Sequence, residues 1–150
     1  MSNDRTDYNT LIPVLEKHRN AFGDMLEAVT ADSGYCSEKN LLYLKENEIR
    51  SYIKLQDHEK RKTRAYKEDI GKYSNMTYAV FEDEHYYICH DGRELRHIRT
   101  ESKELDGYTQ TVKVYGCADC SGCEHKSKCL YRYNAEKNPD RNKVMKINER

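Results

Sequence analysis

Hydrophobic positions at the start of the chain follow first a helical and then a strand spacing. Apolar side chains recur every three or four residues from Leu11 to Leu26, which predicts an amphipathic helix, with Thr10 placed to cap its start. The short apolar run 28–31 then predicts a buried strand. That strand ends at Asp32, directly before a turn.

The same order repeats once. Ser37 can cap a second helix, whose leucines form its buried face and which ends at Asn47, and the alternating segment 49–55 predicts a second strand. Helix, strand, helix and strand with short joints indicate an α/β layer with two parallel strands joined by a right-handed crossover. Two strands do not complete a sheet, so we expect further strands from other sequence or from a partner chain.

Beyond residue 56 the pattern changes to a charged run and then to tyrosine-rich strands. Two hairpins are expected, one around Glu82–Glu84 and one around Asp106 and Gly107. The sequence thus predicts an α/β class with four parts: a partial α/β core at 1–56, a charged connection at 57–75, a β-rich cysteine module at 76–133 and a polar, fraying tail at 134–150.

Composition limits the kinds of partner. The chain has 26 basic and 26 acidic residues, so it has no overall field that draws it to DNA or to an anionic membrane, and any nucleic-acid contact must be local. No stretch has the length of a secretory signal core or of a membrane span, which predicts a soluble cytoplasmic protein without a membrane partner. Thiols stay reduced in that compartment, so the six cysteines favour metal ligation over disulfides.

Four cysteines form a dense cluster with the spacing C-x2-C-x2-C-x5-C, and a fifth lies in the preceding hairpin. They are Cys117, Cys120, Cys123, Cys129 and Cys89. Gaps of two residues let thiolates converge on one cation, and four thiolates make a closed structural zinc site. Any four of the five can serve; a set of Cys89, either Cys117 or Cys120, and the last two would tie the hairpin to the loop. The alternatives are an iron–sulfur cluster, free thiols, disulfides, or a ligand from His90 or His125.

Asp32 is the candidate for catalytic chemistry. A carboxylate at the carboxyl end of a strand in an open α/β sheet can reach a divalent cation in the crevice there. Phosphodiester transfer needs two Mg2+ ions held by several such groups, which one aspartate cannot provide. The alternative role for Asp32 is purely local, as a cap for the following turn.

Two further groups of cations could contact phosphate. The segment 54–67 is rich in lysine and arginine, but interleaved acids favour a solvated, internally paired helix. On a presumed strand, alternation would place Arg93, His97 and Arg99 on one face.

The segment ADSGYCSEKNLLYLKENEIRSYIK, preceded by TDYNTLIPVLEKH, resembles the middle of the DDE transposases of bacterial insertion sequences, and the resemblance continues through CADCSGC. It implies a ribonuclease-H-like core, DNA as partner and Mg2+ as cofactor in an intact member. It also implies that Asp32 is the second of three catalytic acids and that the cysteine-rich insertion holds a structural metal. Cys36 stands where family members commonly have glycine.

The two other family acids have no counterpart in this pattern. The first lies on an upstream strand, whereas Asp4 and Asp7 lie in a polar segment; the glutamate lies on a downstream helix, for which Glu149 is no substitute. We therefore expect an internal, truncated piece of a transposase, with a metal site too incomplete for DNA cutting and strand transfer. The alternatives are a non-enzymatic zinc module that binds nucleic acid or protein, and the product of a decaying gene without a role.

Overall fold

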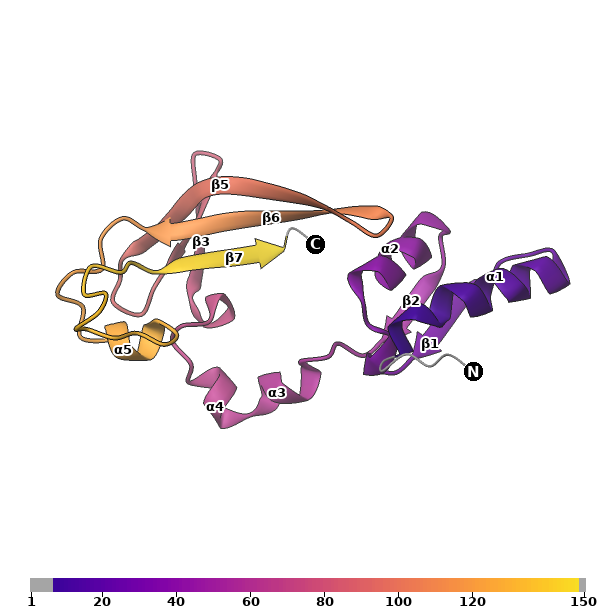
Figure 1. Cartoon of the computed structure of the whole chain (residues 1–150), viewed down its shortest axis with the longest axis horizontal. Coiled ribbons are helices and arrows are strands. Elements are labelled where there is room, and N and C mark those ends of the chain that lie inside the picture. Colours follow the sequence, from indigo (N-terminus) through magenta and orange to yellow (C-terminus); the bar gives the residue numbers. More distant parts are fainter. Residues whose placement is uncertain (1–6, 149–150) are drawn as a thin grey trace. The chain divides into compact units, whose positions relative to one another are not determined.

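The computed structural model describes residues 7–148 and divides the chain into two compact units, Met1–Lys62 and Thr63–Arg150. Each unit has its own hydrophobic cluster. The fold is mixed α/β, with a small parallel sheet in the first unit and a curled antiparallel sheet in the second (Figure 1). None of the helices in the described range has the length and apolar composition needed to cross a bilayer.

The first unit contains the predicted order of helices and strands. Its elements are η1 (Asp7–Asn9), α1 (Leu11–Phe22), β1 (Ala28–Ala31), η2 (Ser33–Tyr35), α2 (Glu38–Glu46), β2 (Arg50–Ile53) and α3 (His58–Lys62). α1 ends four residues earlier than expected, because Gly23 takes a left-handed conformation, with φ of 80°, and its N–H bonds to the Arg19 carbonyl at 2.8 Å. The predicted Thr10 cap is wrong: its hydroxyl donates backwards to the Asp7 carbonyl at 2.8 Å.

The two strands of the first unit are parallel, as the sequence predicted. β1 pairs with β2 over four residues, with Ala28 opposite Arg50. Val29 and Ile53 pack with the cores of α1 and α2, where the most buried side chain is Leu44. Each strand has a single neighbour among residues 7–148, so both outer edges of this small sheet carry backbone groups without a strand partner in that range.

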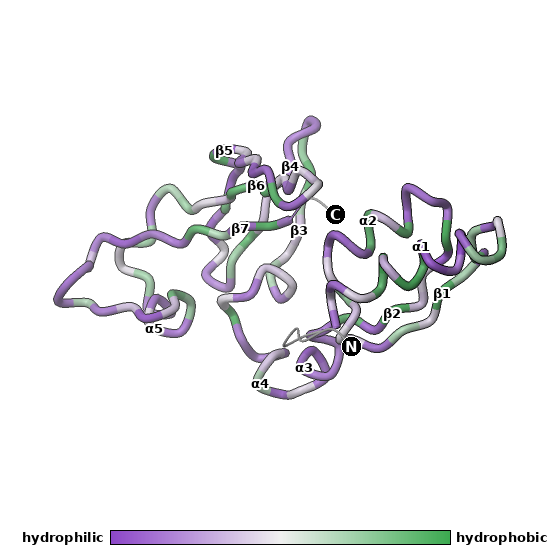
Figure 2. The backbone as a smooth tube through the Cα atoms, turned by 45° about the vertical axis from the view of Figure 1, so that its right-hand side comes forward, coloured by the Kyte–Doolittle hydropathy of each residue, from purple (hydrophilic) through white to green (hydrophobic). Residues whose placement is uncertain are grey.

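The charged connection forms two short helices, α3 and α4 (Arg64–Lys67), and Figure 2 shows how hydrophilic the chain is around α3. Arg61 bonds to Asp57 at 2.7 Å and Arg64 to Glu68 at 2.6 Å, both at helical i,i+4 spacing. The internal pairing that the sequence favoured for this segment is therefore present.

The second unit is built on a sheet with the order β3-β4-β5-β6-β7, in which every pairing is antiparallel. Its remaining elements are η3 (Tyr73–Asn75), β3 (Thr77–Phe81), β4 (Glu84–Ile88), β5 (Glu94–Leu105), β6 (Tyr108–Cys117), α5 (Lys126–Cys129) and β7 (Val144–Asn148). Both predicted hairpins form. The first turns at Glu82 and Asp83, which both have positive φ, and the second at Asp106 and Gly107.

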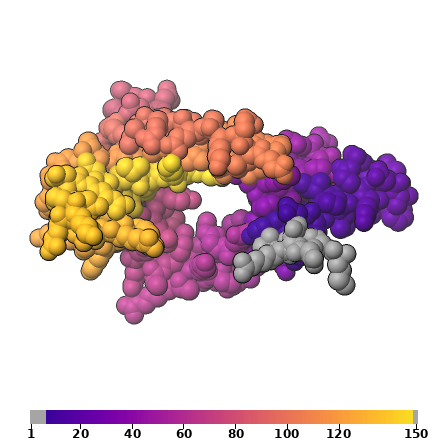
Figure 3. All heavy atoms as spheres, in the orientation of Figure 1, coloured from indigo at the N-terminus to yellow at the C-terminus, as the bar shows by residue number. Residues whose placement is uncertain are grey.

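The expectation of a fraying polar tail is wrong for residues 144–148. This segment pairs with β6 as β7, which lies along β6 in the space-filling view (Figure 3), and Met145 is buried against Tyr115. Its only sequence signal is a short alternation of apolar and polar residues, which is hard to recognise because the flanking residues are mostly charged or polar.

A β-bulge in β5 contradicts the expectation that Arg93, His97 and Arg99 share one face. The register with β6 shifts between His97 and Arg99, so His97 lies opposite Tyr115 while Arg99 lies opposite Val114. Tyr115 and Val114 are consecutive and point to opposite faces, so His97 and Arg99 do as well. A basic strip on one face does not form.

Candidate metal centre

Five of the six cysteines line one small cavity in the second unit, with a volume of about 20 Å³. They come from three places in the fold: the end of the β3–β4 hairpin, the end of β6 with the loop after it, and the end of α5. These residues are Cys89, Cys117, Cys120, Cys123 and Cys129. The cavity adjoins the hydrophobic cluster of the sheet. Leu95, which is fully buried in that cluster, also lines the cavity.

The loop after β6 is held by backbone bonds to the segment before β7. Cys117 N–H donates to the Lys143 carbonyl at 2.9 Å, and Lys143 N–H donates to Cys120 Sγ at 3.3 Å. The side chain of Asn142 accepts from Cys120 N–H at 2.9 Å and donates to the Ala118 carbonyl at 3.0 Å. The position of the central cysteines therefore depends on a segment more than twenty residues away in sequence.

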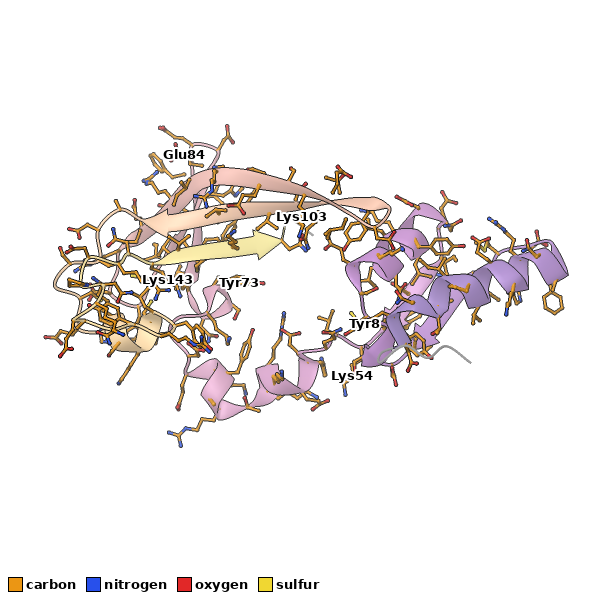
Figure 4. The ribbon with its side chains drawn as sticks, in the orientation of Figure 1. Tyr8, Lys54, Tyr73, Glu84, Lys103 and Lys143 are labelled. Carbon is orange, nitrogen blue, oxygen red and sulfur yellow. The ribbon has the colours of Figure 1, made fainter. Side chains whose placement is uncertain are left out.

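The Lys143 side chain, labelled in Figure 4, connects two further segments. Its ammonium group donates to the carbonyls of Gly71, at 2.8 Å, and Cys129, at 2.9 Å. Gly71 is so close to this point that a Cβ there would lie 2.6 Å from the Cys129 carbonyl oxygen. The last cysteine of the cluster is thus packed against residues that precede β3.

Three cationic side chains line the same cavity: Arg93, Lys126 and Lys143. Arg93 donates to the carbonyls of Asp119 and Ser121, each at 2.9 Å. Lys126 is only 8% exposed, and its ammonium donates to the Pro139 carbonyl. The charged ends of all three side chains are therefore bonded to backbone carbonyls around the cavity.

Burial opposes ionisation of the thiols when they stand alone. It raises the pKa of Cys117 to about 11, with a further contribution from the hydrogen bond to Cys120. Burial likewise raises the pKa of Cys129, while the Lys143 ammonium lowers it. A bound cation would reverse this balance, because a coordinating thiol is deprotonated.

The donor set suits a soft or borderline cation, but the side chains are not gathered around one point. Among residues 7–148, no three His, Cys, Asp or Glu side chains stand in the geometry of a metal site. A thiol moves with its χ1 rotamer, whereas the backbone fixes which segments meet at the cavity. The volume is that of about one water-sized sphere, enough for a single ion.

The histidines considered as alternative ligands lie outside this cavity. The rings of His90 and His125 contact each other edge to face, with centroids 4.7 Å apart, and line a separate hollow with Asp69. The sixth cysteine, Cys36, is in the other unit, in the turn after β1.

Asp32 lies at the carboxyl end of β1 with its side chain exposed. Oδ1 accepts the Gly34 N–H at 2.8 Å, which is the local turn-capping role that the sequence allowed. The Asp7 carboxylate is also close: a Cβ on Gly34 would lie 3.0 Å from Asp32 Oδ1 and 3.9 Å from Asp7 Oδ2. Asp4 and Glu149 lie outside the described residues.

Sequence reasoning missed the cationic and amide side chains around the cysteines. The sequence pattern places Arg93 only in a basic strip, and it places Asn142 and Lys143 in a polar tail. The usable signal was the density of lysine and arginine around the cluster in an otherwise balanced chain. Comparison of the chain with protein-family models, curated proteins and solved structures gives no match.

Proposed function

We propose that the chain is part of a DDE-type DNA transposase whose second unit is held together by a structural zinc ion. The observation that supports the zinc site best is that five cysteines line one cavity, with the buried Lys126 among the other lining residues. The motif around Asp32 supports the family, and the exposed position of this carboxylate at a parallel strand end suits a metal ligand.

The proposed zinc ligands are Cys89, Cys120, Cys123 and Cys129. Cys117 is left out because its thiol donates a hydrogen bond to the Asp119 carbonyl at 3.3 Å, and this bond requires the protonated thiol. Cys120 differs from it, because its sulfur accepts the Lys143 N–H at 3.3 Å and leaves its own proton without a carbonyl acceptor among the described bonds. Four thiolates around Zn2+ carry a net charge of −2, which Lys126 and Lys143 beside the cavity would offset in part.

The role of this zinc is to fix the fold of a small module. The sheet alone buries few side chains completely, so an ion that ties the hairpin, the loop and α5 together would supply much of the folding free energy. A closed set of four thiolates leaves no position for a substrate, which is why we assign it a structural role.

The small parallel sheet of the first unit is compatible with part of a ribonuclease-H-like core. Its two parallel strands, joined through α2, form a sheet with both outer edges free of strands from residues 7–148, as expected for part of a larger sheet. In an intact family member, Mg2+ ions polarise the phosphodiester and activate the attacking group. This chain would contribute one ligand, Asp32, and the purified chain would not cut DNA.

Zinc is tested by metal analysis of cysteine variants. The purified chain should contain one zinc ion, and Cys129→Ser and Cys120→Ser should lose it together with the cooperative unfolding of the second unit. Cys36→Ser is the matched control, because this thiol lies in the other unit. Cys117→Ser should keep its zinc; a loss equal to that of Cys129→Ser would show that the assigned ligand set is wrong.

The role of Asp32 is tested with Mn2+ as a paramagnetic substitute for Mg2+. Titration should broaden the amide resonance of Gly34, which bonds to the carboxylate, and Asp32→Asn should abolish this effect. Asp24→Asn is the control, since it removes an exposed carboxylate elsewhere in the unit. Nuclease activity of the purified wild-type chain would contradict the incomplete site, and unchanged Gly34 broadening in Asp32→Asn would remove the aspartate from metal binding.

The second candidate is a zinc module with a binding role and no catalytic partner. It is favoured by the separate core of the second unit, which contains the whole cysteine cavity. The two proposals differ in the DNA that flanks the gene: an upstream strand ending in aspartate and a downstream helix with glutamate, in any frame, belong only to the transposase.

A further inference from the structure

Two arginines in the second unit differ from the others in having no carboxylate partner. Of the arginines in residues 7–148, all but Arg132 and Arg141 lie within 4.0 Å of an Asp or Glu oxygen. The paired ones are Arg19, Arg50, Arg61, Arg64, Arg93, Arg96 and Arg99. In a chain with equal numbers of acids and bases, guanidinium groups without an acidic partner leave a local positive charge that an anionic partner could use.

Both unpaired arginines contact the same residue, Tyr131. The guanidinium carbon of Arg132 lies 5.1 Å from the centre of the Tyr131 ring, and Arg141 donates to the Tyr131 carbonyl at 2.9 Å. Tyr131 is 75% exposed, the highest value among the large hydrophobic residues of the described range. An exposed aromatic side chain and two guanidinium groups without a carboxylate partner thus lie together.

The backbone at Arg132 takes an uncommon conformation. Arg132 has φ of 52°, a left-handed conformation that costs a side-chain-bearing residue about 1 kcal/mol or more. The neighbouring side chains anchor the loop: Leu130 is buried in the cysteine cavity, and Tyr133 packs on the Lys126 ammonium. The exposed Tyr131 and Arg132 therefore lie between two anchored residues.

The surrounding segment is locally basic. Residues 124–143 contain six lysines and arginines against three acids, whereas the whole chain is balanced. Two of these lysines, Lys126 and Lys143, line the cysteine cavity, whereas Lys128 and Lys137 are exposed.

We propose that Tyr131, Arg132 and Arg141 form a binding surface for unpaired nucleic acid. A base would stack on the Tyr131 ring, and the guanidinium groups would bond to the adjacent phosphates. An acidic peptide would use the arginines but not the ring, and a base inside a duplex could not reach the ring. The surface goes beyond the proposed function, on which it rests only in that zinc would hold the loop that carries it.

The test is fluorescence anisotropy with a labelled oligothymidine of about 12 nucleotides and the zinc-loaded full chain. Tyr131→Ala should weaken binding about 10-fold or more, because each stacked base contributes strongly to single-strand affinity. Tyr52→Ala is the control, since Tyr52 is an exposed strand tyrosine of the other unit, at 59% exposure.

The arginines are tested through the salt dependence. Arg132→Gly suits the left-handed backbone without strain, and Arg141→Gln keeps a polar side chain. The double variant should flatten the slope of log affinity against log salt by about 1.4, since each lost phosphate contact on a single strand contributes about 0.7. Arg64→Gln, at a guanidinium that is exposed and paired, should leave the slope unchanged.

Several results would overturn this proposal. One is equal affinity of Tyr131→Ala and wild type; another is a duplex that binds as tightly as the single strand; a third is full competition by polyglutamate at equal charge. Zinc content, measured on every sample, separates the two hypotheses: a zinc-containing chain that ignores the oligonucleotide contradicts the surface alone, and a metal-free chain that still binds through Tyr131 contradicts the zinc site alone.

Discussion

Replacing Gly71 by alanine tests how tightly the cysteine cavity is built. A Cβ at this position would lie 2.6 Å from the carbonyl oxygen of Cys129 and 3.2 Å from Asp69 Oδ1. The nearer atom belongs to the backbone, so no side-chain rotation can relieve the conflict. To reach an ordinary separation of 3.4 Å, the Cys129 carbonyl must recede by about 0.8 Å.

That movement acts on the Lys143 ammonium, which bonds to both carbonyls at 2.8 and 2.9 Å. Overpacking of this kind costs about 1–3 kcal/mol, and weakening a charge-assisted hydrogen bond is of the same order. For a domain of this size, each kcal/mol lowers the melting temperature by about 4–8 °C. The melting temperature of the second unit should therefore fall by at least about 4 °C.

The assay is thermal unfolding of the chain with zinc and with chelator, together with competition for zinc by a chromogenic chelator. Gly116→Ala is the matched control, because its added Cβ would meet Cδ1 of Ile98, the end of a flexible, exposed side chain that can rotate away. Gly71→Ala should lose more stability than Gly116→Ala and should release zinc more easily. Equal stability of Gly71→Ala and wild type would refute the close approach of this segment to Cys129.

Further expectations concern the core, the titration of a tyrosine and the buried cation. Leu95→Ala should destabilise the second unit by about 2–5 kcal/mol in urea denaturation, because Leu95 is fully buried; a loss below about 1 kcal/mol would contradict its place in the core. Burial, followed by the hydrogen bond to the Glu16 carboxylate, raises the pKa of Tyr43 to about 12 from the ordinary 10.0. The folded state holds this proton more tightly, so the contribution to stability is complete below pH 10 and is lost between pH 10 and about 12; Tyr43→Phe should remove that part of the alkaline loss seen by circular dichroism. Lys126→Met should weaken zinc retention about 10- to 100-fold, whereas Lys128→Met, at an exposed position, should not.

The elements of the first unit were predictable because they depend on local spacing. Leucines at helical intervals, the Ser37 cap and two short apolar runs determine helices and strands through contacts a few residues apart. The early end of α1 was missed because Gly23 stops the helix by its backbone conformation, while apolar residues continue at helical spacing up to Leu26.

In the second unit, turn chemistry located the hairpins but could not give the register along β5. The bulge between His97 and Arg99 leaves no mark in the sequence, and it reverses which face the later side chains occupy. β7 was missed for a related reason: a strand of five residues with two inward apolar side chains becomes stable only when a longer partner strand is already in place.

The sequence by itself determined the order of helices and strands, the parallel pairing in the first unit, and the spacing of cysteines that makes a metal site possible. Tertiary structure decided that Cys89 lines the same cavity as the loop after β6 and that Lys143 bonds to both Gly71 and Cys129. It also decided that the two arginines without a carboxylate partner contact Tyr131. The physical reason is range. Periodicity and capping act within a few residues, whereas a cavity is made where strands distant in sequence are brought together by the pairing of a whole sheet.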